Sequence, residues 1–154
     1  MSENPVIGIA AEPGASAQPY ADAIQRSDGT PWLILPTDGV SAAEALVNMR
    51  GLIITTGPDI DGSMELGEES HTSREALLLK AALEKDMPVL GLSSGIHTLN
   101  VALGGTLAKD ISGHGLTQQD GNERSSYHRI YIAPGSKLAA IVGSGGVVRV
   151  NSRH

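Results

Sequence analysis

Cysteine is absent from this sequence of 154 residues. Without a thiol, the chain can form no disulfide framework, no thiolate metal site and no thiolate nucleophile. Aromatic residues are also scarce, since the chain has one Trp, three Tyr and no Phe. The core is therefore expected to be aliphatic, and cysteine-based chemistry is excluded for this chain.

Positive charge is in short supply too. Eleven Lys plus Arg stand against 17 Asp plus Glu, for a net charge of −6, and the sequence shows no basic run. This balance argues against a nucleic acid or an anionic membrane as a partner. The longest apolar runs are too short to span a bilayer, and the polar start at Met1–Pro5 is unlike a signal peptide. We expect one cytoplasmic domain over residues 1–154.

Short apolar runs alternate with helix signals over the first two thirds of the chain. The runs are strand-sized and lie at 5–10, 32–35, 51–55 and 89–92. Helices are expected at 16–27, from Ser41 to Met49, from Thr72 to Asp86 and at 97–103. Ser41 with Glu44, and Thr72 with Glu75, have the spacing of capping boxes. Continuous apolar strands that alternate with helices predict an α/β fold, in which helices cover both faces of a parallel sheet.

Beyond Gly105 the pattern changes. Residues 127–132 and 147–150 alternate between apolar and polar side chains, as half-exposed antiparallel strands do. Residues 112–126 are polar and rich in glycine, which predicts a loop between these strands. The C-terminal part is therefore expected to be short and antiparallel.

The strongest functional signal is Gly91-Leu-Ser-Ser-Gly95, which lies between a predicted strand and a predicted helix. This is the G-x-S-x-G pattern of a nucleophile elbow, whose small residues allow a sharp turn that exposes Ser93. The following amide and the start of the helix can stabilise an oxyanion. The alternative interpretation is a glycine-rich turn that carries two solvated serines.

The residues around this turn carry a family resemblance. The stretch Pro88–Ile111, which includes G-L-S-S-G-I-H-T-L-N and G-G-T-L-A-K-D-I, resembles the core of class I glutamine amidotransferases of the gamma-glutamyl hydrolase and gamma-glutamyl-GABA hydrolase branch. Gly51–Asp61, Glu65–Glu68, Pro134–Ala139 and Val150–His154 are similar to further motifs of that branch. The resemblance runs in order along almost the whole chain, and it implies a flavodoxin-like sheet flanked by helices.

Several positions depart from the family pattern. Ser93 stands where the family has its nucleophilic cysteine, Ser94 replaces the following arginine, and His97 replaces a glutamine. Thr56 replaces a glycine, next to Gly57, in the loop that the resemblance assigns to the oxyanion hole. His154 falls in a segment that the family uses beside its substrate.

The resemblance also implies a catalytic His and Glu in an H-P-E segment after the V-N-S-x-H motif. The sequence ends at His154. A domain that is truncated at its C-terminus relative to the family is therefore expected.

Other polar residues could act as partners of Ser93 or of a ligand. The histidines His97, His114, His128 and His154 are each weak candidates for a base, and none has the spacing of a metal site. The remaining candidates form an acidic cluster, which fits a solvated loop better than a site for a cation or an amine: Asp59, Asp61, Glu65, Glu68 and Glu69. No metal or other cofactor is predicted.

Three functions remain open. The first is a pseudoenzyme that binds a small glutamine- or gamma-glutamyl-type molecule, or a partner protein. The second is an amide hydrolase that uses Ser93, with His and Glu from another chain or segment. A true α/β-hydrolase would instead combine Ser93 with Asp110 or Asp120 and with His128 or His154. The third is an assembly subunit that buries an uncovered sheet edge in a homodimer.

Overall fold

The computed structural model describes residues 4–11, 17–35, 41–55, 74–108, 111–112, 114–119 and 122–152. Internal contacts divide the chain into two units, Met1–Leu107 and Ala108–His154. Each unit is described by itself below, and the single domain over 1–154 stays a prediction.

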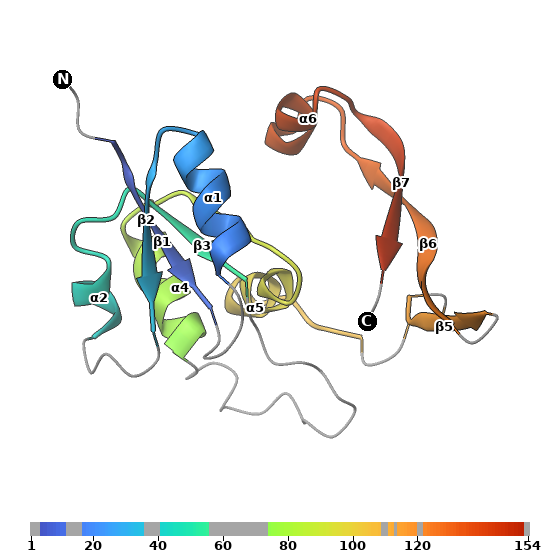
Figure 1. Ribbon diagram of the computed structural model, residues 1–154, viewed down its shortest axis with the longest axis horizontal. Coiled ribbons are helices and arrows are strands. Elements are labelled where there is room, and N and C mark those ends of the chain that lie inside the picture. The colour runs from blue at the N-terminus through green and yellow to red at the C-terminus, as the bar shows by residue number, and fades with distance from the viewer. Residues whose placement is uncertain are drawn as a thin grey trace. The chain divides into compact units, whose positions relative to one another are not determined.

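The first unit contains a four-stranded parallel sheet with strand order β2-β1-β3-β4 (Figure 1). Its strands are β1 (Val6–Ala10), β2 (Thr30–Ile34), β3 (Gly51–Ile54) and β4 (Val89–Gly91). All four coincide with the predicted apolar runs, although β2 begins two residues earlier than the pattern indicated. The sheet with its flanking helices confirms the predicted α/β class.

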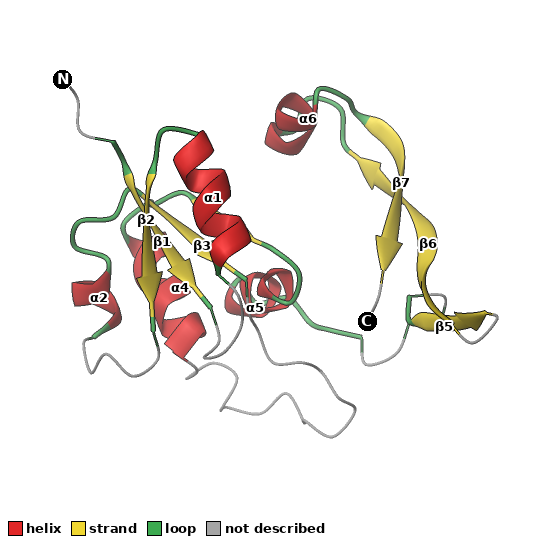
Figure 2. Cartoon of the chain, viewed as in Figure 1, coloured by secondary structure: helices red, strands yellow, loops and turns green. Residues whose placement is uncertain are grey.

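Four described helices pack around this sheet (Figure 2). They are α1 (Gln18–Arg26), α2 (Ala42–Ala45), α4 (Arg74–Glu84) and α5 (Gly95–Ala102). The capping box predicted at α2 is present, because Ser41 Oγ accepts from the Glu44 amide while the Glu44 carboxylate accepts from the Ser41 amide. The second predicted capping box includes Thr72, which lies outside the described residues.

The aliphatic core has two parts, one on each face of the sheet. Alternate residues of β1 point to opposite faces, so that Ile9 belongs to one cluster and Ala10 to the other. The larger cluster joins Ile34, Leu52 and Ile54 of the sheet to α4 and to the turn after α2. The smaller cluster packs α1 on the other face through Ile24.

The outer strand β2 has a proline on its free edge. The Thr30 amide donates to the carbonyl of Pro5, and alternate residues of a strand share this direction. Pro31 therefore faces away from β1, where its missing N–H removes no bond from the sheet. A proline at this position makes strand addition to β2 less favourable.

The second unit is a three-stranded antiparallel sheet with order β5-β6-β7. Its strands are β5 (Leu116–Gln119), β6 (Asn122–Ile132) and β7 (Gly146–Ser152), and α6 (Lys137–Val142) connects β6 to β7. The Arg149 guanidinium lies 4.3 Å from the ring centroid of Tyr127 on the neighbouring strand. Ser136 caps α6 by accepting a hydrogen bond of 3.1 Å from the Ala139 amide.

The antiparallel C-terminal part is confirmed, but the predicted loop over 112–126 is wrong. Strand β5 and the first residues of β6 pair within that segment, with Leu116 opposite Ser125 and Gln119 opposite Asn122. The ladder of backbone hydrogen bonds forms a strand here in spite of a polar sequence. Among the described helices, none is long and apolar enough to cross a lipid bilayer.

Candidate functional site

The predicted elbow is a tight turn between β4 and α5. The Leu92 amide donates to the carbonyl of Ile54 at 2.9 Å, and the Gly95 amide donates back to Leu92 at 2.9 Å. Ser93 at the apex has a φ of +53°, a left-handed conformation that is costly for a residue with a Cβ. Its side chain is exposed. These features are those of a nucleophile elbow.

The two glycines of the motif are required by close backbone contacts. A Cβ on Gly91 would lie 2.9 Å from the carbonyl oxygen of Gly95. A Cβ on Gly95 would overlap the carbonyl oxygen of Ile54 at the end of β3. The turn can therefore bring α5 against the sheet only when both positions lack a side chain.

Thr55 connects the elbow to the neighbouring strands. Its buried hydroxyl and its amide each donate to the carbonyl of Ala10, at 3.1 Å in both cases. Its own carbonyl accepts a long hydrogen bond of 3.5 Å from Ser94 Oγ. The carboxyl ends of β1 and β3 and the start of α5 thus meet at Thr55, at the edge where parallel sheets bind ligands.

Thr55 was not among the predicted site residues. A signal for it was present, because it is a threonine at the carboxyl end of a buried apolar run. The family resemblance assigned the oxyanion loop that follows β3 to Thr56 and Gly57 instead.

His97 lies on α5, one turn after the apex. Its side chain is half-buried, and its Nδ1 atom is buried. Within the described part of the chain, no hydrogen bond joins Ser93 Oγ to a histidine. The structure thus places Ser93, Ser94 and His97 on one turn and helix, and no histidine that the structure describes is bonded to the apex hydroxyl.

Several predicted site residues lie outside the described residues. These are Thr56 and Gly57 of the oxyanion loop, His154, the acidic cluster, and Asp110 and Asp120. Their assignments stay predictions.

Two of the predicted histidines lie together in the second unit. The rings of His114 and His128 stack with their centroids 4.0 Å apart. His128 Nδ1 is 3.4 Å from Ser152 Oγ, which lies across the β6–β7 pair. No group of three potential metal ligands occurs among the residues that the structure describes.

Comparison with curated proteins gives relatives whose names include glutamine amidotransferases. A Mycobacterium tuberculosis protein whose name assigns it to the glutamine amidotransferases is 34% identical over 80% of this chain. A similarly named protein of Schizosaccharomyces pombe is 30% identical over 99% of this chain. The chain spans 44% of the first protein's length and 64% of the second's.

A solved structure supports the same fold. It comes from Thermoplasma acidophilum, and its name describes one of the subunits of a GMP synthase. It matches this chain with a TM-score of 0.60 at 12% identity, over 100% of this chain and 66% of its own.

A family model describes nearly the whole chain. The model for Peptidase C26 matches residues 5–154, a range that includes β1, the elbow and both sheets. Together with the relatives, this match shows that the chain belongs to the glutamine amidotransferase-like family Peptidase C26.

Proposed function

We propose that this chain is a glutamine amidotransferase-like domain that binds a small glutamine- or gamma-glutamyl-type molecule without hydrolysing it. In this proposal the domain is a pseudoenzyme of the gamma-glutamyl hydrolase branch with a binding or assembly role. The observation that carries the proposal is Ser93. The elbow keeps its left-handed backbone and its glycine contacts, but its apex holds a hydroxyl.

A serine hydroxyl needs a base to become an effective nucleophile. No histidine among the described residues is hydrogen-bonded to Ser93. Because the residues of a catalytic triad act as a unit, the lack of one of them removes most of the rate. A hydroxyl in place of the thiolate is thus expected to abolish hydrolysis while the backbone of the elbow is kept.

Ligand binding is supported by what the elbow keeps. The start of α5 lies directly after Ser93, and the partial positive charge of a helix N-terminus favours an amide or carboxylate oxygen there. The relatives' names assign them to the glutamine amidotransferases, which suggests an amide of the glutamine type.

The second candidate is a gamma-glutamyl amide hydrolase that uses Ser93. It is favoured by the strained apex, because left-handed residues of this kind are common where a nucleophile is presented. This candidate needs a His and a Glu from a partner chain or from residues outside the described part.

The decisive experiment is an assay of ammonia or amine release from glutamine and gamma-glutamyl amides. Wild type, Ser93→Cys and Ser93→Ala are compared, with heat of glutamine binding measured on the same samples. We expect wild type and Ser93→Ala to be silent in the assay, while wild type binds glutamine.

The variants separate the two candidates. If wild type releases ammonia and Ser93→Ala does not, the pseudoenzyme proposal is wrong and the serine hydrolase replaces it. If only Ser93→Cys is active, the remaining machinery is intact and the nucleophile alone was lost. If no variant reacts and wild type binds no such ligand, the proposed ligand class is wrong.

A further inference from the structure

The only tryptophan of the chain lies on an edge strand with much of its surface in solvent. Trp32 is 60% exposed, whereas Ile34 and Leu52 on the same sheet face are buried. The residue directly opposite Trp32 is Gly8, which has no side chain to cover the indole. The ring borders a hollow on the face of the sheet that carries α2.

This space is a hollow of about 560 Å³, here called the Trp32 hollow. The volume is within the range of small-molecule sites. The wall is mainly apolar and consists, besides Trp32, of Val6, Ile34, Ala45 and Met49. A ligand that enters it would bury an apolar body against these side chains.

Two polar residues complete the wall, Glu44 and Asn48. The Ser41 hydroxyl and then the Ser41 amide donate to the Glu44 carboxylate, and these bonds lower the pKa of Glu44. Both bonds end on Oε2, at 2.6 and 3.0 Å, so that neither uses Oε1. At neutral pH the hollow therefore has one negative charge at its rim.

An aromatic face and a carboxylate together favour a cation. The π face of tryptophan attracts organic ammonium groups, and a carboxylate pairs with them. The net charge of −6 further favours the approach of cations. An added β-strand is a less suitable occupant, because Pro31 interrupts the free edge beside Trp32.

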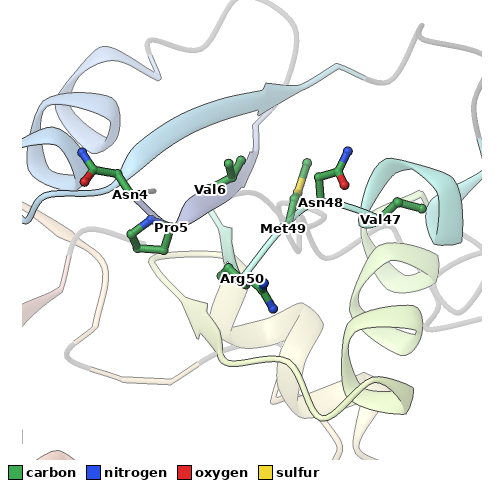
Figure 3. A pocket seen from close by; sticks show the side chains of 7 residues that line it. All are labelled: Asn4, Pro5, Val6, Val47, Asn48, Met49 and Arg50. Carbon is green, nitrogen blue, oxygen red and sulfur yellow. The ribbon is translucent and has the colours of Figure 1, made fainter. Parts of the chain in front are cut away.

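A neighbouring hollow has the opposite charge. It has a volume of about 350 Å³ and shares Val6, Asn48 and Met49 with the first (Figure 3). Arg50 is its charged residue. An anion is expected to bind near Arg50, whereas a cation is expected to bind near Glu44 in the Trp32 hollow.

We propose that the Trp32 hollow is a binding site for a small organic ammonium ion with an apolar body. The ammonium group contacts the Trp32 ring and Glu44, and the body lies against Val6, Ile34 and Met49. The site lies on β2, at one edge of the sheet, whereas the elbow follows β4 at the other edge. It is therefore separate from the site around Ser93, and its test does not depend on the function proposed there.

The single tryptophan makes the test direct. Benzylammonium is titrated into the full chain while Trp32 emission and the NMR signal of its indole N–H are recorded. Benzyl alcohol and benzoate, which carry no positive charge on a similar body, are titrated in parallel. We expect benzylammonium to bind about fivefold more tightly than benzyl alcohol, since an exposed cation–π contact and an exposed ion pair each contribute modestly.

A charge variant assigns this preference to the hollow. Glu44→Gln removes the charge but keeps a capping-box residue at this position, so the variant is expected to fold. Asp22→Asn on α1 removes a charge on the opposite face of the sheet and serves as the matched control. The preference should fall to about twofold in Glu44→Gln, where only the cation–π contact with Trp32 is left, and remain about fivefold in Asp22→Asn.

Two results would overturn the proposal. One is an unchanged preference for benzylammonium in Glu44→Gln, which would place the ammonium elsewhere. The other is a lack of change in both Trp32 signals at millimolar benzylammonium, which would show that the hollow is not such a site.

Discussion

At the scale of residues, single atoms decide the shape of the turn at Ser93. The G-x-S-x-G pattern was sufficient to predict a sharp turn with Ser93 at its apex. The turn leaves no room for side chains at Gly91 and Gly95, so few other residues could stand there. Thr55 could not be found from the same pattern. Its role depends on the carbonyls of Ala10 and of Thr55 itself, which come together only when β1, β3 and α5 have folded.

The contact at Gly95 gives a prediction about stability. Gly95→Ala should lower the free energy of unfolding by about 2 kcal/mol, because its Cβ would overlap the Ile54 carbonyl and push α5 off the sheet. Chemical denaturation followed by circular dichroism measures the effect.

Gly115→Ala is the control for this prediction, since a Cβ there meets nothing within 4 Å. Its effect should stay within about 0.5 kcal/mol. If the free energy of unfolding fell equally in Gly95→Ala and Gly115→Ala, the prediction would be wrong, because the overlap at Gly95 would then have no cost of its own.

At the scale of elements, local signals predicted the parallel part better than the antiparallel part. Most helices and strands of the first unit follow from apolar periodicity and from caps such as Ser41 with Glu44, although α2 ends at Ala45 and the expected helix ran to Met49. Strand β5 has a polar sequence and depends on its partner β6, so no local signal indicated it. Helix α6 was missed as well, since it is short and exposes Leu138 and Ile141 instead of burying an apolar stripe.

The cap of α2 should depend on pH. Because the pKa of Glu44 in the folded chain is lowered, the Ser41 bonds add stability above the ordinary pKa of glutamate. This contribution is lost as the pH falls through the lowered pKa of the folded state.

In Ser41→Ala the pKa of Glu44 should return upward, which carboxyl ¹³C NMR can follow across the acidic range. The difference in stability between wild type and Ser41→Ala should also shrink on acidification. An unchanged pKa in the variant would show that Ser41 is not the cause of the shift.

At the scale of the whole molecule, the distribution of the core differs between the two units. Both apolar clusters belong to the first unit. Among the described residues of the second unit, the buried apolar side chains are Ile132 and Ala139. Composition predicted an aliphatic core, but its confinement to one unit depends on long-range contacts that composition does not reveal.

This difference predicts how the parts behave alone. A fragment of residues 1–107 should unfold cooperatively on heating, because it contains both clusters. A fragment of residues 108–154 should show no cooperative transition, since so short a chain with so little buried surface cannot offset its conformational entropy. Calorimetry of the two separate fragments tests this prediction. A cooperative transition in the fragment of residues 108–154 would contradict it.

The two edges of the parallel sheet are not equivalent. Pro31 removes a donor from the free edge of β2, whereas Val89 and Gly91 of β4 point their backbone groups away from β3. A sheet with two open edges can add copies without end and form a fibre. With Pro31 on one edge, edge pairing between copies would be left to β4, and a pair formed through β4 would close on itself about a two-fold axis. If copies of this sheet associate through their edges, one proline ring would favour a finite pair over a fibre.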